Sequence, residues 1–458
     1  TANTDRNSEL SDITKPDLTP LAPSFITANL KNMRQPTVNI DSVYGDGPAL
    51  GGAATEAAAF YDGIKFKIGA AAAETESIDP ARPSIPGVRI PPEADLMRDL
   101  PRVNKEAQIA DGRNDENLII AQLHVAFLRF HNAAVDWIRK NETAYAMTDA
   151  QVFARAQQLT RWHHQWLVLN DFLPTITLHG IADKVRLGGA KHFKPKGEPF
   201  MPLEFSVAAY RFGHSMVRAA YDHNRNFGRP SDGNTPLIPS ASFDLLFAFT
   251  GKGGQGVNGR GPFIGQTDRL PFNWIIEWDR FVAKGSSIPD HFARKIDTML
   301  APPLSDMVNE GNEAGVPIDI AAILKGLAKR NLLRGYLLSI PTGQAVAGAM
   351  GVTPLSEAEL KKGNTPALNK VLKDGGFLTA TPLWYYVLKE AEVRAAGNSL
   401  GELGSRIVCE TIIGQLKLDP ESYLNQSGGW DPSQGVKMEN GDPIVTIGDF
   451  IRFAGIPA

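Results

Sequence analysis

The sequence predicts a mainly α-helical fold with few short strands, and three observations support this class. Residues 117–140 and 149–173 carry apolar side chains at intervals of three and four, which is the spacing of one face of a helix. The alternation of apolar and polar residues that is typical of strands is sparse, with one plausible strand at residues 64–68. No repeat period is visible along the 458 residues. We therefore expect a single large helical domain.

In chain order, the helices are expected to begin only after an extended part. Residues 1–50 are rich in Pro, Asn, Asp and Thr, which favours turns, and residues 51–458 are expected to form the helical domain. The helix at 149–173 is expected to end before Pro174. Another helix is expected at residues 205–221, around His214. Further helices are expected at residues 273–284, 291–299, 318–340, 356–362, 382–396 and 400–415.

The composition is that of an ordinary globular protein. Hydrophobic residues make up 43% of the chain, charged residues 21%, and the net charge is -3, which indicates no nucleic acid or other polyanionic partner. Cys409 is the only cysteine, so an internal disulfide is excluded. We find no apolar run long enough to span a bilayer and no signal peptide at the start of the chain. Location in a bacterial cytoplasm and secretion both remain open, as does the oligomeric state.

A glycine-rich segment at residues 251–256 matches the dinucleotide-binding pattern G-x-G-x-x-G by letter only. More Gly and a Pro follow at residues 257–262, so no helix N-terminus is available to receive a pyrophosphate. We interpret the segment as a surface loop.

Several histidines could carry chemistry, but a buried structural role is the simpler interpretation for most of them. His124 and His131 are two helical turns apart, and about 10 Å of axial rise is too far for one metal ion. His163 and His164 are adjacent, so they face different directions on a helix. His214 lies in Tyr-Arg-Phe-Gly-His-Ser, where the glycine leaves room for a flat ligand, although such a histidine is more often a core residue.

Two charged segments also have ordinary explanations when each is taken alone. Arg113 and Glu116 stand three residues apart at the start of the helix over 117–140, as in a surface ion pair at a helix start. The cationic segment Arg330–Gly335 could be a solvated helix face or a membrane-surface helix.

Together, these segments form an ordered series that covers nearly the whole chain. The blocks are Asn39–Pro48, Arg113–Asn117 with Gln122–His124 and Phe127–Asn132, Arg161–Trp166 with Asp171–Pro174, Tyr210–Ser215, and Arg330–Gly335 with Pro341–Gln344. This series resembles the animal-type haem peroxidase (peroxidase–cyclooxygenase) superfamily, in its cysteine-poor bacterial branch. The resemblance implies a single helical domain that holds haem b between central helices.

The resemblance also implies a role for each matching residue. His214 corresponds to the proximal ligand of the haem iron, Asn331 to the partner of its other ring nitrogen, and Arg334 to an arginine that meets a haem propionate. Arg113 corresponds to the distal arginine, which stabilises charge on peroxide, and Glu116 to a glutamate that can form an ester with a haem methyl. Asn117 stands where some relatives form a sulfonium link, which asparagine cannot form.

The chain departs from the family in its distal motif. Ser11-Asp12-Ile13-Thr14 resembles the end of that motif, and in this register Ser11 stands in place of the catalytic histidine. Leu10 replaces an ester-forming aspartate, and Asn7 replaces a glutamine. A serine hydroxyl cannot relay a proton between peroxide oxygens as an imidazole does, so the resemblance predicts a weak or altered peroxidase.

A calcium site implied by the same resemblance has lost charge. Its ligands would be Asp12, Gln35, Thr37, Asn39 and Asp41. Gln35 and Asn39 stand where the branch usually has Thr and Asp, and calcium prefers carboxylate oxygens. A weak calcium site and a solvated turn without metal are both open.

Three functions therefore remain open for this chain. It could be a haem oxidoreductase that uses hydrogen peroxide to oxidise small organic or halide donors. It could instead be a haem protein of the same fold that binds a ligand or catalyses another reaction, or a haem-free scaffold protein.

Overall fold

The computed structural model describes most of the chain, with gaps. The described residues are 5–6, 8–15, 17–32, 37–50, 56–73, 95–142, 146–196, 199–228, 240–251, 267–282, 293–307, 310–311 and 315–458. They form a mainly helical molecule with a few two-residue strands, which confirms the predicted fold class.

The elements are as follows. The α-helices are α1 (Pro23–Asn29), α2 (Asp41–Tyr44), α3 (Leu118–Asn141), α4 (Asp149–Leu167), α5 (Leu173–Ile176), α6 (Ile181–Gly188), α7 (Gly213–Met216), α8 (Ile318–Lys325), α9 (Leu327–Leu337), α10 (Gly343–Ala349), α11 (Glu357–Lys361), α12 (Pro366–Asp374), α13 (Leu383–Arg394), α14 (Glu402–Leu418) and α15 (Ile447–Phe453). The 3-10 helices are η1 (Ser8–Ser11), η2 (Glu56–Phe60), η3 (Gly112–Asp115), η7 (Ala209–Phe212), η8 (Phe243–Phe247), η9 (Phe272–Trp274), η10 (Trp278–Arg280), η11 (Pro302–Leu304), η12 (Tyr423–Asn425) and η13 (Pro432–Gln434), whereas η5 (Val168–Phe172) and η6 (Glu204–Ala208) are π-helical. The strands form antiparallel pairs, which are β1 (Asp5–Arg6) with β2 (Lys31–Asn32), β3 (Tyr61–Asp62) with β4 (Lys65–Phe66), β5 (Arg102–Val103) with β6 (Glu106–Ala107), and β7 (Ala220–Tyr221) with β8 (Ala241–Ser242).

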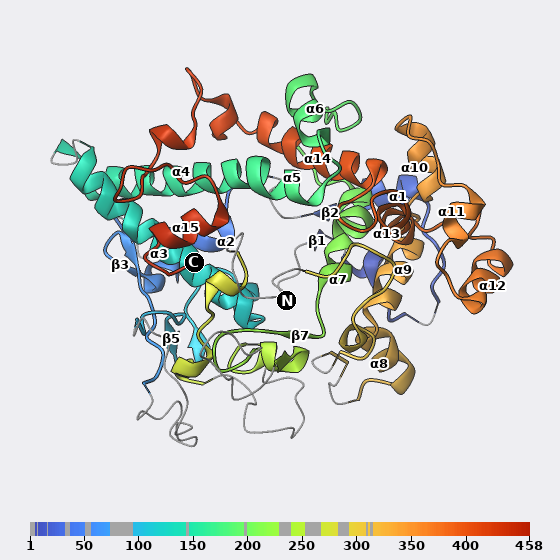
Figure 1. Ribbon diagram of the computed structural model, residues 1–458, viewed down its shortest axis with the longest axis horizontal. Helices are drawn as coiled ribbons and strands as arrows, with labels where there is room; N and C mark the ends of the chain where they lie inside the picture. Colours follow the sequence, from blue (N-terminus) through green and yellow to red (C-terminus); the bar gives the residue numbers. More distant parts are fainter. Residues whose placement is uncertain are drawn as a thin grey trace.

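The packing of α3 against α4 forms one half of the molecule (Figure 1). Asn117 caps α3 by accepting a hydrogen bond from the amide of Ile120, and a capping box of Thr148 and Gln151 starts α4. The C-terminal helix α15 packs on α3, where the rings of Phe130 and Phe450 stack with centroids 3.9 Å apart. The two predicted helices at 117–140 and 149–173 are thereby confirmed.

The helix α4 does not stop before Pro174. It continues through the π-helical turn η5 into α5, and Pro174 sits in the first turn of α5, where its missing amide proton costs no hydrogen bond. Figure 1 shows α4 and α5 as one long rod. The predicted end of this helix was therefore wrong by a few residues.

The segment around His214 is irregular, although the sequence predicted one helix over 205–221. It passes from the π-helical η6 through the 3-10 helix η7 into the four-residue α7. At β7 the backbone is already in the extended conformation of a strand. Helices α9, α13 and α14 pack against η6, and α13 and α14 also pack against η7. The surrounding helices, rather than one regular helix, therefore position the histidine.

Two other predicted helices are absent from the described residues. Residues 273–282 hold the short 3-10 turns η9 and η10, because their backbone groups bind other segments: the Ile276 amide donates to Gln122, and the Glu277 amide donates to the carbonyl of His223. Residues 293–299 are also bound elsewhere, with the amide of Ile296 donating to the carbonyl of Gly397. The remainder of both predicted ranges lies outside the described residues.

The other predicted elements vary in accuracy. The helix at 318–340 is divided at Gly326 into α8 and α9, while α11, α13, α14 and β4 lie within or close to their predicted ranges. The part over 1–50 is not simply extended, because it contains α1 and α2. The short helices α6, α10, α12 and α15 were not predicted.

Among the described residues, α3 is long and apolar enough to cross a membrane by length and composition alone. In the structure, 61% of its apolar window is buried inside the molecule. The apolar character of α3 therefore belongs to a core helix that packs against α4 and α15.

Candidate active site

His214 lies at the centre of the candidate site, on α7. The carbonyl of Arg211 accepts a hydrogen bond from the indole of Trp384 on α13 at 3.2 Å, which fastens the preceding turn. The hydroxyl of Ser215 donates to the carbonyl of Phe212 at 2.8 Å. These bonds fix the turn that leads into the short helix.

Asn331, on α9, contacts the imidazole of His214. Its amide nitrogen Nδ2 lies 2.9 Å from the ring Nδ1, and only 3% of Asn331 is exposed. In this orientation Nδ2 donates and Nδ1 accepts, which leaves the ring proton on Nε2. Half a turn of the amide would bring Oδ1 to the same place, where it would accept from an Nδ1–H and free the Nε2 lone pair.

The His214 ring is neutral at pH 7. Burial, followed by the positive charges of Arg211 and Arg330, lowers its pKa from 6.5 to about 4. A neutral imidazole is the form that binds a metal.

Arg211 and Arg330 lie near this histidine, and Arg334 lies near Arg211. Burial and the nearby charges of Arg334 and Arg330 lower the pKa of Arg211 to about 10. The Nε of Arg211 donates to the carbonyl of Ser206 at 3.1 Å, and among the described residues no carboxylate lies within ion-pair distance of Arg211. Arg330 lies 3.5 Å from Glu310. The half-buried Arg211 charge is therefore suited to an anionic ligand.

The second predicted group lies at the start of α3. Arg113 belongs to η3 and Glu116 follows it, and both residues are half-buried. The Nε of Arg113 donates to Asp111 Oδ1 at 2.8 Å, and 37% of the Arg113 side chain is exposed. The Glu116 carbonyl accepts from the hydroxyl of Thr250. Asp111 is thus the immediate partner of the predicted distal arginine, and sequence reasoning missed it.

Ser11 is the last residue of η1, which packs against α9, the helix of Asn331 and Arg334. Leu10 is half-buried beside it, and Asn7 lies outside the described residues. The distal role of Ser11 remains a prediction.

The predicted calcium ligands form local turns in the structure. Asp12 accepts from the amide and the hydroxyl of Thr14 at 2.9 and 2.6 Å, and Asp41 accepts from the amide of Ser42 at 2.9 Å. Asn39 accepts from the Asp41 amide at 3.2 Å. The hydroxyl of Thr37 is buried without a hydrogen-bond partner in the described part of the chain, and Gln35 lies outside that part. These contacts are those of Asx turns, and the calcium site remains a prediction.

His124, His131 and His163 of the long helices are buried core residues, and His164 is half-buried. The Tyr44 hydroxyl lies 3.0 Å from Nδ1 of His131, and Nε2 of His131 lies 2.9 Å from the carbonyl of Ile64, so both ring nitrogens are satisfied. Burial lowers the pKa of His124, His163 and His164 to about 4, about 3 and about 4.

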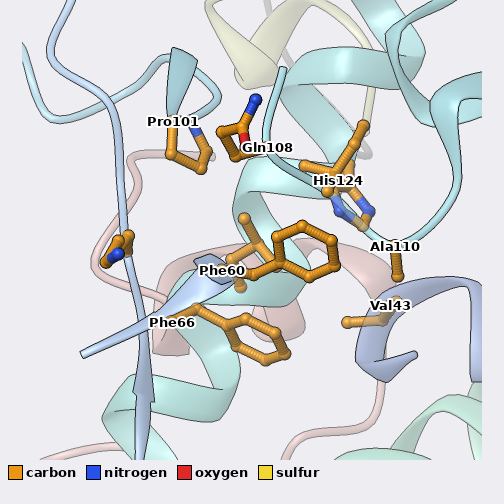
Figure 2. A pocket seen from close by; sticks show the side chains of 10 residues that line it. Val43, Phe60, Phe66, Pro101, Gln108, Ala110 and His124 are labelled. Carbon is orange, nitrogen blue, oxygen red and sulfur yellow. The ribbon is translucent and has the colours of Figure 1, made fainter. Parts of the chain in front are cut away.

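His124 lines a small hollow with the rings of Phe60 and Phe66, and Val43 faces them (Figure 2). The hollow has essentially no room even for a water molecule. Neither His214 nor Asn331 is among the residues that line it. This hollow is therefore not the place for a porphyrin.

Sequence reasoning also missed Arg211 as part of the site. The signal was present, because a cation three residues before His214 lies close to it on any helical turn.

Part of this chain is similar to known peroxidases. A family model described as animal haem peroxidase matches residues 86–243. A peroxidase-like protein of Margaritifera margaritifera is 30% identical over 165 residues, which are 35% of this chain and 20% of that protein. Thyroid peroxidase of Rattus norvegicus is 30% identical over 107 residues, which are 23% of this chain and 11% of that protein. The chain thus spans a small part of the curated relatives it matches.

The fold is also that of known structures. Peroxidase A from Dictyostelium discoideum matches 92% of this chain and 70% of its own length, with a TM-score of 0.53 and 16% identity. A fatty acid alpha-dioxygenase of Oryza sativa matches 93% of this chain and 62% of its own length, with a TM-score of 0.50 and 14% identity. The assignment to a bacterial branch stays a prediction. Over residues 86–243, the chain is similar to the animal haem peroxidase family.

Proposed function

We propose that this peroxidase-like oxidoreductase binds haem b and uses hydrogen peroxide to oxidise small organic or halide donors, with weakened or altered activity. The observation that supports this most directly is the 2.9 Å contact between Asn331 and His214 beside a cluster of arginines.

The residues present fit a haem group in their chemistry. Iron takes a neutral imidazole, and the lowered pKa keeps His214 neutral. Haem also carries two propionates, and the buried Arg211 charge, which has no carboxylate within ion-pair distance among the described residues, suits such an anion. When bound, haem would supply the redox chemistry.

On the proximal side, His214 would hold the iron through Nε2. Asn331 would accept a hydrogen bond from Nδ1–H through Oδ1 and so fix the tautomer and the ring plane. An amide accepts without adding negative charge, so the imidazole stays less anionic than it would beside a carboxylate. Arg211 and Arg334 would bind the propionates.

On the peroxide side, Arg113 would stabilise negative charge on the departing oxygen. Its pairing with Asp111 offsets part of that charge, which weakens the effect. Ser11 cannot relay the proton at neutral pH, and losing a general acid–base group typically costs roughly 10²–10⁴-fold in rate. An ester through Glu116 and a low-affinity calcium site near Asp41 belong to the same proposal.

A second candidate is a haem protein of this fold that is not a working peroxidase. The pairing of Arg113 with Asp111 and the serine at position 11 favour it. In that case, haem binds but peroxide does not drive oxidation of a donor dye.

The test is an absorption spectrum and an iron analysis of purified protein, before and after addition of hemin. We expect a Soret band, peroxide-dependent dye oxidation, and loss of both in His214→Ala. The matched control is His179→Ala, because His179 is an exposed histidine, and it should change neither. Colourless protein that ignores hemin contradicts haem binding and favours the scaffold function; a Soret band without turnover favours the second candidate.

A further inference from the structure

The segment Asp111–Asn117 carries the two predicted peroxide-side residues on one of its sides. Residues three apart eclipse in a 3-10 turn, so Arg113 and Glu116 project in the same direction from η3. Asn114 and Asp115 then point elsewhere. The Asn114 amide donates to the carbonyl of Ser42 at 3.0 Å, which ties the segment to α2.

Asp115 ties the same segment to the core. Its carboxylate accepts two parallel hydrogen bonds from Arg102, at 2.9 and 3.0 Å, and the two side chains are 3% and 2% exposed. The amide of Gly251 donates to the carboxylate of Asp115 at 3.0 Å and to its carbonyl at 2.8 Å. Such a two-point contact fixes orientation as well as distance.

Arg102 is itself held in place from two directions. It lies in β5, which turns back to β6 through Asn104 and Lys105, both with positive φ (51° and 72°), as in a tight hairpin. Its Nε lies 3.4 Å from Asp99, whose carboxylate also accepts from the amides of Leu100 and Leu270, each at 2.7 Å. The arginine therefore cannot follow Asp115 if that residue moves.

We propose that Arg102 is a positioning residue that aims Arg113 and Glu116 at the reacting side of the site through its buried pair with Asp115; this rests on the proposed function. Arg102 touches neither of the two residues. It acts on the backbone that carries them, and removing it leaves the Asp115 carboxylate buried without its cation.

Amide hydrogen exchange of the haem-free protein tests the positioning directly. Arg102→Lys keeps the positive charge but loses the planar guanidinium that donates two parallel hydrogen bonds, and Arg102→Met loses both the charge and these hydrogen bonds. We expect faster exchange of the amides of Arg113 and Gly251 in both variants, at least tenfold in Arg102→Met, with α4 unchanged. Arg280→Lys is the matched control, because Arg280 is a buried arginine paired with Glu277 at 2.8 Å in another segment.

In haem-loaded protein, we expect Arg102→Lys to lower the rate constant for reaction with peroxide, on the order of tenfold to a hundredfold, while the KM for the donor changes less than twofold. Exchange at Arg113 and Gly251 that matches Arg280→Lys overturns the proposal. If Arg102→Met does not fold, wild-type protein still decides: fast, unprotected exchange at Gly251 overturns it. Failure of haem binding would refute the proposed function but leave the exchange result standing.

Discussion

At the scale of single residues, the two sides of the site are built by opposite electrostatics. His214 is kept neutral by burial and by the nearby charges of Arg211 and Arg330, and Arg330 lies 3.5 Å from Glu310. Arg113 is instead paired with a carboxylate two residues away and stays partly exposed. In the proposed function, the His214 side therefore suits an anionic cofactor, whereas the Arg113 side has a cation whose charge is compensated by Asp111.

The role of Ser11 gives the first prediction at this scale. If a missing proton relay limits turnover, Ser11→His should raise peroxidase turnover per haem by up to roughly 10²–10⁴-fold, because an imidazole titrates near neutral pH. Turnover is measured by dye oxidation and normalised to haem content. Ser24→His, at an exposed position of α1, is the control and should have no effect. Unchanged turnover in Ser11→His at equal haem content would remove the missing-base explanation.

At the scale of elements, the sequence predicted a helix well where one face of that helix packs against the core along its whole length. The period of α3 and α4 is regular because each packs along its length, and both were predicted within a few residues. The 205–221 range was not, because three helices bind its backbone and side chains at once and convert it to π-helical, 3-10 and α-helical turns. In an apolar run such as Trp274–Ile276, all side chains are buried, so no alternation of apolar and polar residues distinguishes a helix from another conformation.

The helix α10 gives a prediction at this scale because it contains two glycines in different surroundings. A Cβ on Gly343 would lie 2.0 Å from Cγ of Tyr386 on α13, whereas nothing lies within 4 Å of a Cβ on Gly348. Gly343→Ala should therefore destabilise the protein by about 1–3 kcal/mol through overpacking. Gly348→Ala should stabilise it by roughly 0.5–1 kcal/mol, because alanine favours helix. Urea unfolding of both variants measures the two shifts, and shifts of the same sign would contradict this packing.

At the scale of the whole molecule, the site joins residues that lie far apart in the chain. The pairing of His214 with Asn331 spans 117 positions and could be predicted only because the resemblance supplied it. The Arg102–Asp115 pair and the charge of Arg211 could not, since a charged residue carries the same letter whether it is buried or solvated. The sequence allows residue types and local periodicity to be predicted. It does not show which charged side chains are buried in the folded protein.

The buried histidines make the whole molecule sensitive to acid. Burial lowers the pKa of His124, His131, His163, His164, His214 and His223 from 6.5 to between about 3 and about 4. Between those values and 6.5, the unfolded chain binds protons that the folded chain does not, so stability falls as the pH falls. Each histidine costs about 2 kcal/mol between pH 7 and pH 5. Burial raises the pKa of Asp99 and Glu390, which acts in the opposite sense, but these carboxyl groups are outnumbered.

Six such histidines act in the same direction, so the stability of the haem-free protein, measured by urea titration, should fall steadily from pH 7 to pH 5. His124→Leu should make this fall shallower, because it removes one group that takes up a proton only on unfolding. The number of protons taken up on unfolding should drop by about one. His179→Leu should leave the slope unchanged, because His179 is exposed in the folded protein. A stability that is flat from pH 7 to pH 5 would mean that these imidazoles already reach water or a charged partner in the native state, and the lowered pKa of His214 that supports the proposed haem binding would be contradicted.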